Sequence, residues 1–331
     1  MDSTTYFNPY SNETFFGVIF QFFTRFFLFL SGNLPLNEMA ADEIQVIVLI
    51  AVSASCALVG SFLVLRKMTM LANSLSHTIL LGIVIAFLWK TSFSSDSATH
   101  GLSISSLLIA SLIMGLITTF LTEFLTKVTK LQEDASIGLV FTSLFAVGIV
   151  CLTVLMRNAH IGTEAVMGNV DALEIDDIKL VLTIFAINAI LIFLFFKEFK
   201  ITTFDKQLSS ALKISPVFFN YLLMAEVSAT SIGAFRAVGV LMVLAFITGP
   251  PLMARLVTHD LKKLLLISVA IGTFVSIFGV ALSRHLLTVY GLSLSTAGIT
   301  VSTIFVMYCI LAVWHLMPSF RFKQTFSQDS L

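Results

Sequence analysis

Charged residues are scarce in this chain. Of its 331 residues, 57% are hydrophobic and only 11% are charged, whereas soluble domains average about 25% charged residues. A soluble protein of this composition would have too little polar surface to face water. The 19 basic residues are balanced by 19 acidic ones, so no basic field exists that would attract nucleic acid. These shortages exclude a soluble protein and a nucleic-acid-binding protein.

Cysteine motifs and catalytic motifs are also missing. The three cysteines, Cys56, Cys151 and Cys309, stand singly inside apolar runs, and no CxxC spacing indicates a thiolate metal site or a disulfide framework. The chain has no HExxH, GxSG or P-loop motif, and therefore no signature of protease or ATPase chemistry. We expect a protein that is not an enzyme. If ATP powers it, another subunit must hydrolyse that ATP.

The chain consists largely of apolar segments of about 20 residues, the length at which a helix crosses a hydrocarbon core of roughly 30 Å. The clearest spans cover about residues 43–65, 70–89, 102–122, 136–156, 178–196, 216–236, 238–250, 264–284 and 299–316. The Phe-rich segment 14–30 contains Gln21 and Arg25, so it is either a further span or an amphipathic helix in the membrane interface. The sequence predicts an all-α, polytopic bundle of eight to ten transmembrane helices.

Basic residues are concentrated in one set of connections between these spans. That set contains Arg66, Lys67, Lys127, Lys130, Lys197, Lys200, Lys206, Lys213, Arg255, Lys262, Lys263, Arg321 and Lys323, and the other set little more than Lys90, Arg157, Arg236 and Arg284. Lys and Arg near the ends of spans prefer the cytoplasmic side, so the first set is predicted to be cytoplasmic. We expect three parts: an N-terminal segment 1–42, a transmembrane domain 43–316 and a short cytoplasmic tail 317–331.

The segment 216–250 contains too many residues for one crossing and is interrupted near 233–239, which predicts a hairpin or a broken helix. Pro250 and Pro251 should end the apolar run, because proline cannot continue the hydrogen bonds of a helix. The stretch 252–263 that follows is basic and amphipathic, which predicts a short helix along the cytoplasmic membrane surface. Its polar residues, Arg255, His259, Asp260, Lys262 and Lys263, are candidates for docking a cytoplasmic partner.

Polar groups within apolar spans are the candidates for function, because such groups usually face protein or a water-filled path. Asn73 and His77 are four residues apart and therefore share one face of a helix. An imidazole beside an oxygen donor suits a borderline divalent metal. A transient site needs few ligands, because an ion that is bound too tightly would not leave. The alternative is that His77 forms a hydrogen bond with a neighbouring helix.

Other charged groups are also candidates. Glu226 and Arg236 lie about ten residues apart. They either line a pathway or form ion pairs with other helices, or Arg236 only extends its charged end to the membrane surface. Glu123 and Lys127 are spaced for an ordinary pair along one helix. The longest external loop carries His160, Glu164, Asp171, Glu174, Asp176 and Asp177. This acidic group attracts cations, receives a partner protein that delivers them, or is only solvated.

Several segments together resemble the permease subunits of the bacterial metal-uptake ABC transporters. They are GSFLVLRKM at 60–68, SH at 76–77, LGI at 81–83, EDASIGLVF at 133–141, GN at 168–169, TFD at 203–205, AVGVLMV at 237–243, the stretch 250–263 and STAG at 295–298. No single motif is decisive, but their order along the chain is specific. The resemblance covers about residues 43–316.

The resemblance implies a permease in the bacterial cytoplasmic (inner) membrane that imports zinc, manganese or iron by alternating access. It implies ATP-binding ABC subunits docked on 252–263, an external metal-binding solute-binding protein, and a second permease copy or a paralogous permease. The metal passes through, and no cofactor is bound permanently. In the family, an aspartate precedes the histidine at the position of His77 by four residues, where this chain has Asn73. Arg236 stands where the family commonly has a neutral residue.

A carrier or channel driven by an ion gradient is the competing hypothesis. It would be favoured by a relay of carboxylates inside the spans, which this chain mostly lacks. A membrane-embedded enzyme would need a nucleophile, an acid pair or a metal motif in the spans, and the sequence contains none of them. The resemblance therefore favours the ATP-driven importer.

Overall fold

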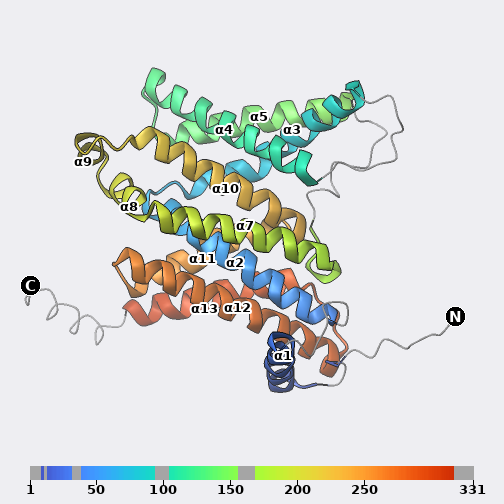
Figure 1. Cartoon of the computed structure of the whole chain (residues 1–331). Coiled ribbons are helices and arrows are strands. Elements are labelled where there is room, and N and C mark those ends of the chain that lie inside the picture. Colours follow the sequence, from blue (N-terminus) through green and yellow to red (C-terminus); the bar gives the residue numbers. More distant parts are fainter. Residues whose placement is uncertain (1–8, 11–12, 32–38, 94–103, 156–167, 317–331) are drawn as a thin grey trace, which may run out of the picture.

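The computed structural model of the chain is a bundle of long helices (Figure 1). It describes residues 9–10, 13–31, 39–93, 104–155 and 168–316. The helices are α1 (Phe15–Leu30), α2 (Ala41–Leu65), α3 (Thr69–Phe93), α4 (Ile104–Thr129), α5 (Glu133–Leu155), α7 (Ile175–Leu194), α8 (Phe196–Phe204), α9 (Lys206–Ala211), α10 (Pro216–Val238), α11 (Val240–Val257), α12 (Leu261–Tyr290) and α13 (Thr296–Leu316), with a short 3₁₀ helix, η2 (Val170–Ala172). No strand occurs among the described residues, and the all-α prediction is confirmed.

Seven helices are long and apolar enough to cross a membrane: α2, α7, α10, α11, α12, α13 and the part of α4 from Leu112 to Thr129. α3 and α5, with 25 and 23 residues, run beside α4 (Figure 1). A helix of 23 residues is about 35 Å long, which exceeds a hydrocarbon core of roughly 30 Å. With these two, the described part of the chain has nine helices of spanning length, within the predicted range of eight to ten.

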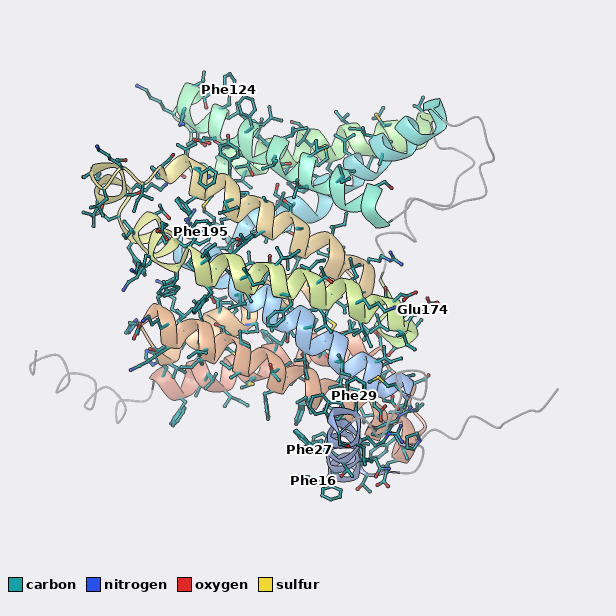
Figure 2. The ribbon with its side chains drawn as sticks, in the orientation of Figure 1. Phe16, Phe27, Phe29, Phe124, Glu174 and Phe195 are labelled. Carbon is teal, nitrogen blue, oxygen red and sulfur yellow. The ribbon has the colours of Figure 1, made fainter. Side chains whose placement is uncertain are left out.

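The two ends of the bundle differ in charge. The basic end, at the left of Figure 1, comprises the turn after α2, the ends of α4 and α7, the helices α8 and α9, and the connection from α11 to α12. Its basic residues are Arg66, Lys67, Lys127, Lys130, Lys197, Lys200, Lys206, Lys213, Arg255, Lys262 and Lys263. The opposite, acidic end carries Asp42, Glu43, Asp171, Glu174, Asp176 and Asp177. Figure 2 places Phe195 at the basic end and Glu174 at the acidic end.

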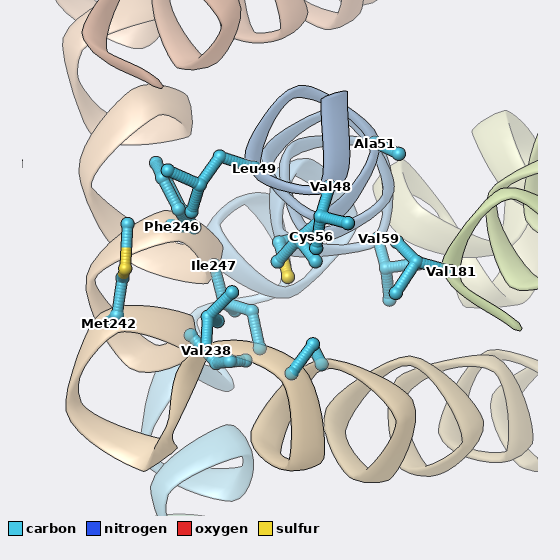
Figure 3. Packing of buried hydrophobic residues seen from close by; sticks show 14 of the residues in the cluster. Val48, Leu49, Ala51, Cys56, Val59, Val181, Val238, Met242, Phe246 and Ile247 are labelled. Atoms are coloured by element: carbon cyan, nitrogen blue, oxygen red, sulfur yellow. The ribbon is translucent and has the colours of Figure 1, made fainter. Parts of the chain in front are cut away.

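The core is built around α2. Side chains all round this helix, including Val48, Leu49 and Cys56, are fully buried, as expected of a helix that is apolar on every side. Figure 3 shows them against Phe246 of α11 and other buried residues. A side chain at Gly60 would overlap the carbonyl oxygen of Ile247, so this glycine allows the two backbones to touch.

One residue makes the turn between α10 and α11. Gly239 has a φ of 84°, in the region that favours glycine. Gly168 packs against this turn, where a side chain would lie within 2.6 Å of the carbonyl oxygen of Arg236 and the amide nitrogen of Gly239. The break predicted within 216–250 is therefore confirmed, and the distant segments 168–169 and 237–243 meet at it.

The expectation for residues 250–263 is wrong. α11 continues through Pro250 and Pro251 to Val257, and α12 begins after a connection of three residues. Each proline removes one hydrogen bond of the helix, but the side chains around them are buried, with Met253 0% exposed. Packing therefore holds the helix together. The predicted surface helix is instead the end of α11, a short connection and the first turn of α12.

Candidate functional site

α3 carries both predicted metal residues, Asn73 and His77. Positions 70, 73 and 77 fall on one face of the helix by their spacing. On this face Met70 is 61% exposed and Asn73 is also exposed, whereas Ser74 beside them is buried. The side chain of His77 lies outside the described residues. In the first turns of α3, the face that carries Met70 and Asn73 thus points away from the interior of the bundle.

Glu226 of α10 lies at about the same depth in the bundle as the candidate metal positions of α3. Ser228 of α10 and Leu75 of α3 both flank the Cβ position of Gly115 in α4, and Leu75 lies between the two candidate metal positions. Two residues rotate a helix by about 200°, so Glu226 is on the side of α10 opposite Ser228. The structure therefore does not bring Glu226 next to α3.

The surroundings of Glu226 include a buried polar cluster. Asn188 of α7 donates hydrogen bonds of 2.6 Å to Ser55 of α2 and to Thr230 of α10. Because α7 and α10 are antiparallel, Glu226 lies one turn nearer the basic end, level with Ile192. The Glu226 residue is 3% exposed, and neither carboxyl oxygen has a hydrogen-bonding partner among the described residues. A buried carboxyl group without a partner in a spanning helix is a candidate for function.

The other charged candidates have partners. Nη2 of Arg236 lies 3.9 Å from Oδ1 of Asp177 at the acidic end, so Arg236 and Glu226 do not pair with each other. Nζ of Lys127 lies 2.6 Å from Oε1 of Glu123, which confirms the pair predicted along this helix. Of the acidic loop, His160 and Glu164 lie outside the described residues.

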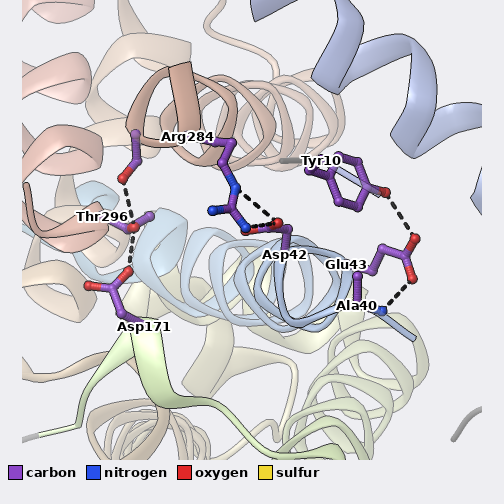
Figure 4. A network of polar contacts seen from close by, with 8 residues as sticks. Tyr10, Ala40, Asp42, Glu43, Asp171, Arg284 and Thr296 are labelled. Carbon is purple, nitrogen blue, oxygen red and sulfur yellow. Dashed lines mark hydrogen bonds and ion pairs between the residues drawn. The ribbon is translucent and has the colours of Figure 1, made fainter. Parts of the chain in front are cut away.

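Further polar contacts join the helices at the acidic end (Figure 4). Arg284 of α12 forms an ion pair with Asp42 in the first turn of α2. Thr296 at the start of α13 donates a hydrogen bond of 2.5 Å to Asp171 of η2. The phenol of Tyr10 donates to Glu43, and burial, followed by the nearby carboxylate, raises the pKa of Tyr10. Within the described ranges, no three His, Cys, Asp or Glu side chains form a group that could hold a metal.

At the basic end, α8 is fixed to α2 and α10. Arg66, which caps α2, donates hydrogen bonds of 3.1 and 3.2 Å to the hydroxyls of Thr203 and Thr202, and one of 3.1 Å to Oδ1 of Asn220. Phe199 is fully buried between Phe62 of α2 and Phe219 of α10, with ring centroids 5.4 and 5.5 Å away. These contacts make α8 a rigid extension of the bundle.

α9 follows α8 at the edge of the basic end (Figure 1). Asp205 separates the two helices and caps α9 by accepting hydrogen bonds of 2.9 Å from the amides of Gln207 and Leu208. The residues Phe204, Leu208 and Leu212 are 59%, 48% and 53% exposed. The α8–α9 unit (196–211, with Leu212) thus presents apolar side chains beside basic ones.

The predicted docking residues lie beside this unit. Arg255 is in the last turn of α11, Asp260 caps α12 by accepting from the amide of Lys262, and Lys263 follows in its first turn. Nζ of Lys262 lies 5.9 Å from the centre of the Phe196 ring in α8, a cation–π distance. His259 lies between the two helices. The sequence predicted a docking role for this connection but not for the α8–α9 unit, whose sequence signals were the TFD segment at 203–205 and the basic residues Lys197, Lys200 and Lys206.

Comparisons with known proteins agree with this architecture. The ABC 3 transport family matches residues 43–315, from the first turn of α2 to the last turn of α13. The Chlamydia trachomatis serovar D protein named "Probable metal transport system membrane protein" is 39% identical over 93% of this chain and 94% of its own length. The manganese transport system membrane protein MntD of Bacillus subtilis is 36% identical over 70% of this chain and 79% of its own.

A solved structure has the same fold. PsaBC from Streptococcus pneumoniae, determined in complex with Fab, superposes with a TM-score of 0.70 at 23% identity, over 93% of this chain and 99% of that one. The resemblance drawn from the sequence motifs is confirmed. The chain is an integral membrane protein, and it belongs to the ABC 3 transport family.

Proposed function

We propose that this chain is the membrane permease of an ATP-driven importer for a divalent transition metal. The observation that carries the proposal is the family match across all the helices from α2 to α13, together with relatives named as metal transport membrane proteins. The metal, zinc, manganese or iron, is the cargo. The chain would lie in the bacterial cytoplasmic membrane with its basic end in the cytoplasm.

ATP-binding subunits would dock at the basic end. The docking surface we propose combines the α8–α9 unit with the adjoining residues Arg255, His259, Asp260, Lys262 and Lys263. Exposed phenylalanine and leucine surrounded by charged residues suit a protein interface, in which apolar anchors lie within a polar rim. The contact between Lys262 and Phe196 makes the two parts one surface.

Movement at this surface would reach α3 through Arg66. This arginine holds α8 by two threonine hydroxyls and stands in the turn that joins α2 to α3. Asn73 and His77 follow two to three helical turns later. Displacement of α8 by closing ATPases would therefore shift the candidate metal residues, as alternating access requires.

The face of α3 that carries the candidate metal residues would be completed by a second permease. Positions 70, 73 and 77 lie on the outward face of α3, and two residues of one chain are too few for a complete coordination sphere. A second copy or a paralogous permease packed on this face would add its own ligands and enclose the path. A solute-binding protein would deliver metal at the acidic end, where Asp176 and Glu174 attract cations.

Restored growth is the cellular test of this function. A bacterium that lacks its own importers for manganese and zinc grows poorly without added metal. Expression of this chain with its partner ATP-binding subunits and binding protein is expected to restore growth on metal-depleted medium and raise cell-associated metal. Restoration without the ATP-binding subunits would instead support a carrier driven by an ion gradient.

Replacement of Glu226 by leucine tests whether this residue belongs to the pathway. The change removes a buried polar group without a partner, which costs about 1–3 kcal/mol, so the melting temperature should rise while metal uptake falls. Gain of stability with loss of activity is typical of a functional residue. The control Asn188→Leu removes a side chain that makes two hydrogen bonds and should lower stability. Unchanged uptake in Glu226→Leu would show that Glu226 is not on the pathway.

A further inference from the structure

α1 has three distinct faces. At 100° per residue, the face toward the bundle carries Phe15, Val18, Ile19, Phe22, Phe26 and Phe29, and a second face carries Phe16, Phe20, Phe23 and Phe27. A third face carries Thr14, Gly17, Gln21 and Thr24, with Leu28 as its one large apolar residue. The residues of the second face, the phenylalanine stripe, are 81%, 75%, 45% and 67% exposed. A helix that contacts protein, lipid and water at once needs this threefold division.

The position of α1 agrees with this division. Figure 1 shows α1 almost end-on while the spanning helices run across the view, so α1 lies across them. It packs on α12 near the acidic end, where the rings of Phe15 and Phe278 are 5.2 Å apart. With 16 residues it is about 24 Å long, shorter than a hydrocarbon core of roughly 30 Å.

A buried carboxylate fastens α1 to the start of α2. Glu43 forms an ion pair with Arg25 of α1 and accepts hydrogen bonds of 2.9 Å from the phenol of Tyr10 and the amide of Ala40. Arg25 lies between the bundle face and the Gln21 face of the helix. This attachment fixes the rotation of α1 and turns the phenylalanine stripe away from the bundle (Figure 2).

We infer that α1 lies in the membrane interface at the acidic end, with the phenylalanine stripe inserted among the acyl chains of that leaflet. Lipid suits the stripe because the apolar surface continues onto α12, where Phe278 stacks on Phe274 at 6.0 Å and Phe274 is 55% exposed. The Gln21 face is then turned toward the headgroups and water. The position of α1 in the membrane does not depend on which solute the protein carries.

Tryptophan probes measure the depth of the stripe. In a variant whose native Trp89 and Trp314 are replaced by phenylalanine, Phe16→Trp and Phe27→Trp place probes near the two ends of the stripe, and Gln21→Trp is the control. The protein is reconstituted in phosphatidylcholine vesicles with lipids brominated at known depths. Because 11 residues separate the stripe probes, they would differ in depth by about 16 Å if α1 crossed the membrane upright.

The expected result is that both stripe probes are quenched by the same shallow bromines, several-fold more than the Gln21 probe, which aqueous acrylamide quenches instead. Two different depths for the stripe probes would overturn the inference in favour of a spanning helix. Stripe probes that no brominated lipid quenches would overturn it in favour of a protein partner that covers the stripe. Emission spectra with and without denaturant establish that each variant is folded; Phe16 and Phe27 are exposed and Gln21 is half-buried.

Discussion

Replacement of His77 by alanine is expected to lower metal uptake at least about tenfold while leaving the complex assembled. Loss of even an outer-sphere partner of a metal site costs about 10–100-fold in affinity, and loss of a ligand should cost no less. By its spacing, position 77 shares a face of α3 with the exposed Asn73, and the amount of assembled complex is measured beside uptake. Uptake of radiolabelled manganese and zinc by proteoliposomes measures the effect.

His315 provides the matched control. It is an exposed histidine in the last turn of α13, so His315→Ala makes the same chemical change far from α3. Uptake by this variant is expected to equal that of the parent protein. If His77→Ala also transports normally at equal protein level, His77 does not handle the metal, and its role is a hydrogen bond within the bundle.

A change at Asn73 tests the site by adding a stronger ligand instead of removing one. Asn73→Asp supplies the carboxylate that the family resemblance implies at this position. A carboxylate is a stronger ligand than an amide oxygen, so half-maximal uptake should occur at a lower metal concentration. The maximal rate should not rise, because an ion that is held more tightly leaves more slowly. Unchanged concentration dependence would mean that residue 73 does not contact the ion.

The second large effect is expected at the docking surface. Leu208→Asp replaces an exposed apolar side chain of α9 with a charged one, and burying an unpaired charge in an interface costs about 2 kcal/mol or more. Binding of the ATP-binding subunit should weaken roughly 30-fold, which corresponds to that energy. Titration of the purified permease in nanodiscs with the ATP-binding subunit measures the change.

Two comparison variants distinguish the parts of this surface. Lys179→Glu, at an exposed site near the acidic end, should leave binding unchanged. Lys262→Glu with Lys263→Glu should weaken binding less than Leu208→Asp, because rim charges contribute less than apolar anchors. If Leu208→Asp binds normally and the double lysine variant does not, docking rests on the connection from α11 to α12 rather than on α9.

Most of the fold was predictable because the membrane imposes simple requirements. Each spanning helix must satisfy its own backbone hydrogen bonds and present about 20 apolar residues, and both features are visible in local sequence. The break at Gly239 was predictable because the segment 216–250 contains too many residues for one crossing and is interrupted near 233–239. The prediction that Pro250 and Pro251 end the helix was wrong because it considered only the hydrogen bonds that proline removes locally. Packing around Met253 holds α11 together across both prolines.

The candidate site was predictable only where it is local. Asn73 and His77 share a face because they are four residues apart, and the structure keeps them on one helix. The anchoring of α8 by Arg66 joins residues more than 130 positions apart, and Asp177, the partner of Arg236, also lies on a different helix. The burial of Glu226 without a hydrogen-bonding partner among the described residues likewise depends on how helices distant in sequence pack, and no local sequence pattern predicts that packing.

Transport by the reconstituted complex tests whether this chain is the permease of an ATP-driven metal importer. The permease is placed in proteoliposomes with its ATP-binding subunits and solute-binding protein, and uptake of manganese, zinc and iron(II) is measured with ATP, with a non-hydrolysable analogue, and with imposed ion gradients. At least one of these metals is expected to accumulate only when ATP is hydrolysed, whether or not a gradient is present. Accumulation that follows a sodium or proton gradient without the ATP-binding subunits would contradict it.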